Sequence, residues 1–380
     1  MNNYNLDNFE PAARIVVIGV GGAGNNAVNR MIDEDIQNVE FYVMNTDKQA
    51  LSTSKAVNRI PLGEEITNGL GAGGDPHVGE EAAEASKDDI AEVVKGANLV
   101  FIAAGMGGGT GTGAAPVVAR IAREAGALVV AIVTRPFTFE GKKRISNSVE
   151  GLNKLKENVD SFIVVGNDRL LVMSGNAPIS EAFSQADKVL AQSVKTVVNL
   201  ILLPAIINLD YADVKSTLKD SGVALIGFGQ GSGPSRSKDA ANNAINSPLL
   251  EASIKGARRA IIAVTCGPEV SLFEAQDTVN RIIGVAGRDI DIKFGININY
   301  QLSDEIIASV IASDFEEEID FSKIPPFNPL DALGSPAKTA GTQDTLLGVE
   351  KVEQASVTNA EDKKEETDED SILPSFLKNL

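Results

Sequence analysis

The sequence has one cysteine, one histidine and no tryptophan among its 380 residues. The lone cysteine, Cys266, excludes an internal disulfide framework and any cysteine-rich metal site. The lone histidine, His77, makes a histidine-based zinc site or a Ser-His-Asp triad nearly impossible. These two absences favour a function that needs neither cysteine nor histidine chemistry.

Long apolar runs are also missing. Residues 127–133 and 197–203 are among the longest runs, and both are far shorter than the ~20 residues of a membrane span. Residues 1–14 lack the basic region and apolar stretch of a secretory signal. The sequence therefore predicts a cytoplasmic protein.

Basic residues are in deficit, with 34 Lys and Arg against 52 Asp and Glu, for a net charge of −18. Such a charge argues against general affinity for nucleic acid. Residues 316–380 hold 15 acidic and 6 basic side chains, which is half of the net charge. Their composition predicts a disordered acidic linker over 316–370, followed by a short apolar peptide over 371–380.

The chain from residue 14 onward alternates short apolar runs with helical patterns, which predicts a doubly wound α/β domain with a parallel sheet. The expected strands are 15–19, 41–44, 99–103, 128–133 and 162–165, and the expected helices are 23–32, 78–94, 115–125 and 143–158. We place this domain at 14–178, after a flexible N-terminus at 1–13.

A long amphipathic helix is expected at 179–203, because apolar residues recur there at spacings of three and four. Pro204 would stop it. A smaller α+β domain is expected at 204–315. Its predicted strands are 224–228, 259–265, 290–298 and 306–313, and its predicted helices are 238–245 and 272–286.

A first glycine loop follows the first expected strand and matches the pattern G-x-G-x-x-G at residues 19–24. Glycines let the backbone approach phosphate groups, and the next helix offers free N–H groups to the anion. Alone, the pattern also fits an NAD-dependent oxidoreductase, with Asp47 as the ribose-binding acid, or a tight turn without a ligand.

A second glycine loop is more specific, with six glycines among residues 105–113. So many glycines are entropically costly in a plain connector. Threonine hydroxyls among backbone amides suit phosphate oxygens. The sequence has no G-x-x-x-x-G-K-[ST], so this is no P-loop NTPase, and we expect backbone dipoles and a metal ion to offset the phosphate charge.

Residues 107–113, Gly-Gly-Gly-Thr-Gly-Thr-Gly, are similar to the signature loop of the tubulin superfamily, and their context resembles the FtsZ family of bacterial cell-division GTPases. The resemblance covers about 14–314 and resumes at the terminal peptide. It also rests on residues 20–30, 45–47, 134–140 with Arg144, 167–170, 208–213 and 303–306.

The resemblance implies a GTP or GDP site, with Mg²⁺ carried by the nucleotide rather than by dedicated protein ligands, and K⁺ as a further candidate ion. Phosphates and sugar would lie against the glycine loops and the segments facing the γ-phosphate: Gly21, Gly22, Ala23, Gly24, Asn25, Asn26, Asn45, Thr46, Asp47, Ala72, Gly73, Gly108, Gly109, Thr110, Gly111, Thr112 and Gly113.

The sugar and base would be contacted from further along the chain. The resemblance implies that Glu140 binds ribose, that Arg144 lies against the nucleotide, and that Asn167 and Asp187 read guanine. One carboxylate can accept both N1–H and the 2-amino group of guanine, a donor pair that adenine lacks. Taken singly, Glu140 and Arg144 also fit a surface ion pair, Asp187 a solvated acid and Asn167 a turn residue.

Asn208, Asp210 and Asp213 follow the long helix. Read alone they are loop residues, with Asp213 capping the next helix. The resemblance makes them the loop that activates water for attack on the γ-phosphate. A helix running about 16 residues, or roughly 24 Å, beyond Asp187 would keep them from their own nucleotide. We therefore expect head-to-tail filaments in which each subunit completes its neighbour's active site.

Two alternatives stay open: an NAD-dependent oxidoreductase, and a scaffold that binds nucleotide without turnover. The terminal peptide resembles the FtsZ segment that docks on membrane-tethering division proteins at the mid-cell ring, through Ile372, Leu373, Phe376 and Leu377. At two places the sequence departs from the residues that are usual in the FtsZ family. Leu203-Pro-Ala-Ile-Ile207 replaces the commoner Pro-Gly-Leu-Ile, and Val165-Gly166 replaces the usual Ile-Pro before Asn167.

Overall fold

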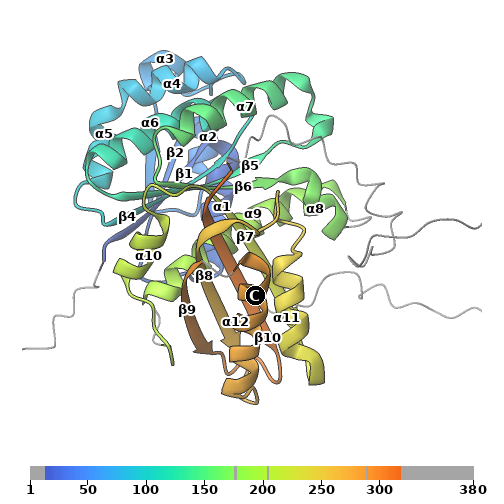
Figure 1. The fold of residues 1–380 in the computed structure, drawn as a ribbon. Helices are drawn as coiled ribbons and strands as arrows, with labels where there is room; N and C mark the ends of the chain where they lie inside the picture. The colour runs from blue at the N-terminus through green and yellow to red at the C-terminus, as the bar shows by residue number, and fades with distance from the viewer. Residues whose placement is uncertain (1–12, 175–177, 203–204, 288–289, 318–380) are drawn as a thin grey trace, which may run out of the picture.

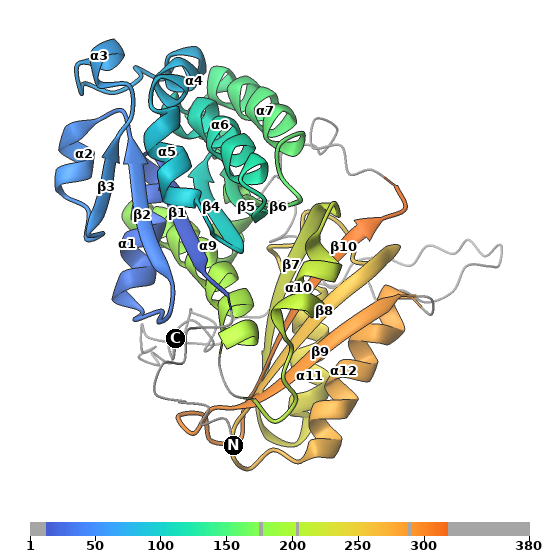
Figure 2. The same cartoon turned by 90° about the vertical axis from the view of Figure 1, so that its left-hand side faces the viewer.

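The computed structural model describes residues 13–174, 178–202, 205–287 and 290–317. The described residues fold as drawn in Figure 1, and ten strands within them form one sheet in the order β3-β2-β1-β4-β5-β6-β7-β10-β8-β9, all labelled in Figure 2. The strands are β1 Ile15–Val20, β2 Glu40–Asn45, β3 Asn58–Pro61, β4 Leu99–Gly105, β5 Leu128–Arg135, β6 Ser161–Gly166, β7 Gly222–Gly231, β8 Ala257–Cys266, β9 Asp291–Ile298 and β10 Ile306–Phe315.

The strands from β3 to β6 pair only in parallel and carry helices on both faces. Side chains alternate along β1: Ile15 and Val17 join the core beneath α1 and α9, whereas Val16 and Ile18 join the core beneath α4 to α7. These helices are α1 Gly21–Asp33, α4 Pro76–Ala85, α5 Lys87–Val94, α6 Thr110–Glu124, α7 Lys142–Lys156 and α9 Ile179–Leu202. The predicted doubly wound domain is confirmed.

The C-terminal half of the sheet has a different pattern. β10 pairs antiparallel with both β7 and β8, and β8 pairs parallel with β9. One face packs on α11 Arg236–Ile245 and α12 Leu272–Ala286 in a core of its own. The two halves meet through β6 and β7, which pair over only three residues, and α9 runs between them (Figure 2).

The long helix is confirmed as α9, which ends at Leu202; Pro204 lies outside the described residues. The single helix expected at 78–94 was wrong, because the chain breaks at Ser86 into α4 and α5. The Ser86 hydroxyl there accepts a hydrogen bond from the Gly63 N–H at 2.9 Å. The helix expected after Asp213 is found as α10 Tyr211–Leu218, which begins before that residue. Further short elements were not predicted: α2 Lys48–Ser52, β3, α3 Glu64–Thr67, α8 Asn167–Ser174 and two 3-10 turns, Thr138–Glu140 and Gly233–Ser235.

None of the helices that the structure describes is long and apolar enough to cross a membrane. The acidic linker, from 318 onward, and the terminal peptide with Ile372, Leu373, Phe376 and Leu377 lie outside the described residues.

Candidate functional site

The two glycine loops meet at one edge of the sheet. β1 and β4 are adjacent parallel strands, with Gly19 opposite Ala103, so the loops after them start side by side. A Cβ added to Gly21, whose φ is +72°, would come within 2.8 Å of the Gly111 nitrogen. The structure therefore brings together two loops whose first residues, Gly19 and Gly105, are 86 positions apart in the sequence.

Some glycines in these loops are needed for packing and others leave open space. A Cβ on Gly24 would lie 2.2 Å from the Ala103 carbonyl oxygen, and one on Gly113 would lie 1.9 Å from the Pro76 carbonyl oxygen. At Gly22 and Gly108, by contrast, an added Cβ would meet nothing within 4 Å. These two positions line space that a ligand can occupy.

The second loop leads into α6, whose first residue is Thr110. The Thr110 and Thr46 hydroxyl oxygens are 2.6 Å apart, and Thr112 accepts a hydrogen bond from the Gly107 N–H at 2.8 Å. The free N–H groups and positive dipole end of this 15-residue helix favour an anion. The edge thus has the backbone chemistry of a phosphate site.

Asn25, Asn45 and Asp47 shape this edge through internal hydrogen bonds. With the Asn25 amide turned so that its oxygen and nitrogen both find partners, its nitrogen donates to the carbonyl oxygens of Gly21 at 2.9 Å and Gly19 at 3.0 Å, and its oxygen accepts from the Asn45 amide at 3.2 Å. Asp47 caps α2 by accepting from the Gln49 N–H at 2.8 Å. Ala72 is buried nearby, whereas Gly22, Asn26 and Gly73 are exposed.

Glu140 and Arg144 form a side-chain ion pair, as an i,i+4 spacing allows. Glu140 also accepts a hydrogen bond from the Phe137 N–H at 2.9 Å, which fixes the turn that follows β5. The position of this pair therefore fits both a surface ion pair and a contact with the nucleotide.

Asn167 and Asp187 lie on α8 and α9, two helices that pack against each other. Asn167 is only 6% exposed, and its side-chain oxygen has no hydrogen-bond partner among the residues that the structure describes. Burial raises the pKa of the Asp187 carboxyl to about 7, against a smaller lowering by the Arg30 charge. The site therefore holds a buried acceptor without a donor and a poorly solvated carboxylate, both of which fit the N–H groups of a guanine base.

Phe183 is a further candidate that sequence reasoning missed. It lies one helical turn before Asp187, is 42% exposed, and meets the buried Phe137 ring edge-on at a centroid distance of 5.1 Å. A half-exposed aromatic ring fixed in this way offers a face for base stacking. The i,i+4 spacing of Phe183 and Asp187 was the signal that could have found it.

Asn208, Asp210 and Asp213 lie elsewhere. The helix of this segment, α10, begins at Tyr211, and its N-cap is Asp210 rather than Asp213. The Asp210 side chain accepts from the Asp213 N–H at 2.8 Å, and Asp213 reaches back to the Asp210 N–H at 3.3 Å. Asp213 fails as a cap because it is the third residue of the helix, where it completes a capping box. Asn208 accepts from the Ala205 N–H at 2.6 Å.

The Tyr211 hydroxyl donates to the Asn98 carbonyl oxygen at 2.7 Å. Asn98 immediately precedes β4, whereas the second glycine loop follows β4. α10 therefore starts at the opposite edge of the parallel sheet, separated from the glycine loops by the length of a seven-residue strand, roughly 20 Å. The structure does not bring Asp210 and Asp213 to the phosphate edge of their own chain.

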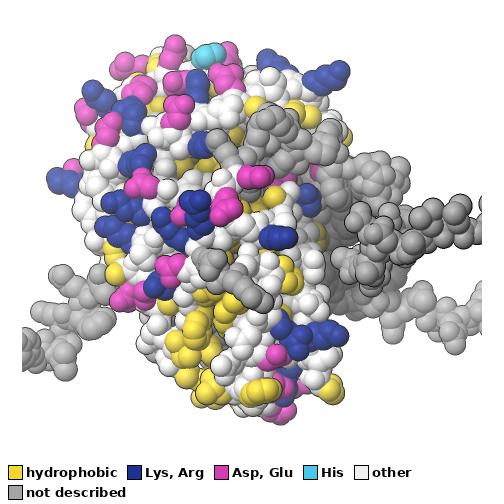
Figure 3. All heavy atoms as spheres, viewed as in Figure 1, with side chains coloured by type: hydrophobic (Ala, Val, Ile, Leu, Met, Phe, Trp, Pro, Cys, Tyr) yellow, Lys and Arg dark blue, Asp and Glu magenta, His cyan; other side chains and the backbone are white. Residues whose placement is uncertain are grey.

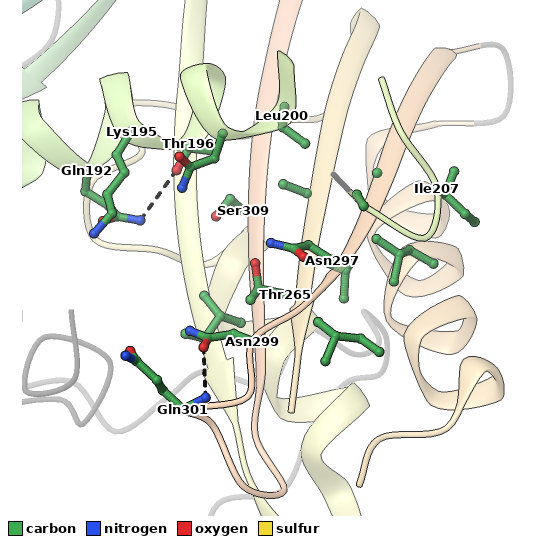
Figure 4. Close-up of a pocket in the computed structure, with 18 of the residues that line it drawn as sticks. Gln192, Lys195, Thr196, Leu200, Ile207, Thr265, Asn297, Asn299, Gln301 and Ser309 are labelled. Atoms are coloured by element: carbon green, nitrogen blue, oxygen red, sulfur yellow. Dashed lines mark hydrogen bonds between the residues drawn. The ribbon is translucent and has the colours of Figure 1, made fainter. Parts of the chain in front are cut away.

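A cavity of about 580 Å³ lies between the second half of α9 and the sheet of β8, β9 and β10 (Figure 4). Its polar lining includes Gln192, Thr196, Asn297, Asn299 and Gln301. None of the lining residues belongs to the glycine loops, so this cavity is separate from the candidate site. Across the described residues, no group of three or more His, Cys, Asp or Glu could hold a metal ion.

Comparison with known proteins agrees with this geometry. Residues 14–175 match the GTPase domain of the tubulin/FtsZ family, and residues 222–316 match the FtsZ family C-terminal domain. A solved FtsZ dimer from M. jannaschii is 42% identical, over 79% of this chain and 88% of that one, with a TM-score of 0.76. The chain belongs to the tubulin/FtsZ family.

Two further solved structures are similar. A substituted FtsZ from M. jannaschii is 41% identical over 81% of this chain and 94% of that one, with a TM-score of 0.77. CetZ2 from Haloferax volcanii, in a GTPγS-bound protofilament, shares the fold at 21% identity, over 85% of this chain and 100% of that one, with a TM-score of 0.70. The match to the family's GTPase domain implies that this chain binds GTP and GDP.

Proposed function

We propose that this protein hydrolyses GTP only after assembling head to tail, with each nucleotide held by one subunit and completed by Asn208, Asp210 and Asp213 of the next. The observation that carries the proposal is the separation of these residues from the glycine loops along β4. Repetition of one contact between two different surfaces gives an open filament.

Within one subunit, the residues predicted above would divide the work. The α6 N-terminus and both glycine loops would bind the phosphates, with Gly22 and Gly108 leaving room for close approach. Asn167 and Asp187 would select guanine, and Phe183 would support the base. Mg²⁺ bound with the nucleotide would supply neutralising charge, and K⁺ is a further candidate ion. Asp210 and Asp213 of the next subunit would hold and polarise the attacking water.

Exposed apolar side chains near the glycine loops and in the C-terminal half support a head-to-tail contact between subunits. Near the glycine loops, Leu70 is 84% exposed. In the C-terminal half, Ile206, Phe294 and Tyr300 are exposed on or beside the edge strand β9, where hydrophobic atoms gather in the lower part of Figure 3. Large exposed apolar side chains that cluster mark association surfaces.

In the cell, we place the filament in the cytoplasmic division ring at mid-cell, in keeping with the FtsZ relatives. The acidic segment at 316–370 would act as a tether. The terminal peptide would dock on membrane-tethering and regulatory division proteins through Ile372, Leu373, Phe376 and Leu377.

The test measures phosphate release from GTP against protein concentration, with Mg²⁺ and K⁺, together with light scattering. A shared site predicts a threshold concentration above which both signals rise together. Turnover strictly proportional to concentration, without scattering, would mean that each chain is a self-contained enzyme and would overturn the shared site.

A further inference from the structure

Glu251 is a buried carboxylate in the C-terminal half of the molecule, with its side chain 3% exposed. It follows Leu250, which packs in the core of α11 and α12. Its oxygen Oε2 lies 3.4 Å from Arg135 and 3.8 Å from Arg169, both of which belong to the N-terminal half. Burial raises the pKa of Glu251, and the two guanidinium charges oppose that rise. A buried carboxylate is costly unless such partners are kept in place.

The contact is built around Gly166, the last residue of β6. The Gly166 backbone opposes the rise in the pKa of the Glu251 carboxyl. A Cβ at position 166 would lie only 2.2 Å from Glu251 Oε1. The glycine at position 166 is therefore what admits the carboxylate.

Asn167, which follows Gly166, is held from both sides. Ahead of it, Gly166 lies against Glu251. Behind it, Asp168 accepts from the Thr138 N–H at 2.9 Å, and Arg169 donates to the Glu251 carbonyl oxygen at 3.3 Å. The side-chain oxygen of Asn167 is buried between these anchors, and no described residue hydrogen-bonds it.

We propose that Glu251 is a positioning residue for guanine recognition: from the C-terminal half, it fixes the backbone on either side of Asn167 so that the Asn167 amide meets the base. The inference rests on the proposed role of Asn167 as a base-reading residue. It makes the guanine site depend on a residue about 85 positions further along the chain, in the unit that also carries β8 to β10.

The experiment titrates fluorescently labelled GDP and ADP into the full-length protein, kept below its assembly threshold. Glu251→Gln keeps the side-chain shape and removes the charge. We expect GDP affinity to fall roughly tenfold and ADP affinity to stay nearly unchanged, because ADP makes no guanine contacts to lose. Glu92→Gln, on an exposed glutamate, is the control and should change neither affinity.

A double-mutant cycle with Asn167→Ala separates positioning from general destabilisation. If Glu251 acts through Asn167, the double variant binds GDP no more weakly than Asn167→Ala alone. Additive losses, or equal losses for GDP and ADP, would overturn the proposal. Should Glu251→Gln not fold, Gly166→Ala displaces the same carboxylate by steric overlap and must reproduce the selective loss of GDP affinity.

The cycle also separates this inference from the proposed function. If Asn167→Ala leaves GDP affinity unchanged, base reading by Asn167 is wrong. If Asn167→Ala weakens GDP binding but Glu251→Gln and Gly166→Ala do not, only the positioning role of Glu251 is wrong.

Discussion

Tyr211 is hydrogen-bonded through its hydroxyl to the carbonyl oxygen of Asn98, at 2.7 Å. This bond ties the first residue of α10 to the residue that precedes β4, at the edge of the sheet away from the glycine loops. Asp210 and Asp213 flank Tyr211, so their carboxylates are held where the chain's own phosphate edge is out of reach. Substitution of these two carboxylates is therefore the most direct test of a site shared between subunits.

Asp210→Asn should abolish GTP turnover and spare nucleotide binding. Asparagine caps a helix about as well as aspartate, so α10 should remain intact while the charge that polarises water is lost. We expect turnover to fall at least roughly a hundredfold, as for loss of a key electrostatic group. Phosphate release and GDP titration measure the two quantities. Asp213→Ala should likewise spare GTP binding and abolish turnover.

Mixing provides the control for this variant. Asp210→Asn subunits should bind nucleotide without supplying the carboxylate, whereas Gly108→Ala subunits should supply the carboxylate without binding nucleotide. Turnover should therefore reappear when the two inactive variants are mixed, because an Asp210→Asn subunit can hold GTP beside the intact Asp210 of a Gly108→Ala neighbour. If the mixture stays as inactive as each variant alone, the carboxylate acts within its own chain.

Guanine nucleotide binding should depend on pH through Asp187. The pKa of Asp187 is raised from 3.8 to about 7 by burial, so below pH 7 the nucleotide-free protein carries a neutral acid there. Guanine donors need the ionised carboxylate, so binding below this pH must release a proton. We expect the Kd for GDP to rise up to about tenfold between pH 7 and pH 6, and to level off above pH 8.

Asp187→Asn is the matched variant, since it retains the titration of the nucleotide phosphates. Its GDP affinity should be weak, and any pH dependence should come from the phosphates alone. A Kd with the same pH profile in both proteins would show that Asp187 does not contact the base.

The fold could largely be predicted from the sequence because its signals are local. The fully apolar runs at β1, β4, β5 and β6 indicated a parallel sheet covered on both faces, and the stripe along α9 indicated one long helix. The break at Ser86 could not be predicted, because it depends on a hydrogen bond to Gly63, which is distant in sequence. α8 was missed because it is only eight residues long, and the start of α10 was misplaced because both Asp210 and Asp213 can cap a helix.

The candidate site, like the fold, could be predicted from the sequence only in part. Both glycine loops were evident from composition, and the adjacency of β1 and β4 brings them together. The buried environment of Asp187 and the orphaned oxygen of Asn167 arise from packing between α8 and α9. Glu251 carried no signal at all, since its partners Arg135 and Arg169 lie more than 80 residues away.

Cys266 should be inert in the native protein. It is 3% exposed at the end of β8, and burial raises its pKa to about 11, so almost no thiolate exists at pH 8. Ellman's reagent should release one equivalent of product only after denaturation in urea. Fast reaction of the folded protein would mean that this end of β8 opens readily.

Gly108→Ala should block phosphate binding without disturbing the fold. An added Cβ at this position meets nothing within 4 Å, and its φ is not positive, so the backbone can accept alanine. The methyl group would instead occupy the space offered to a phosphate. We expect the melting temperature of the nucleotide-free protein to change by no more than about 2 °C, and GDP affinity to fall at least roughly tenfold.

Gly284→Ala is the control: it is an exposed glycine inside α12 with equally open surroundings. That change should raise the melting temperature by a few degrees, because alanine favours a helix by about 1 kcal/mol, and should leave GDP affinity unaltered. If Gly108→Ala binds GDP normally, the open space at Gly108 is not part of the phosphate site, and the second glycine loop must bind the nucleotide through Gly109, Thr110 and Gly111 alone.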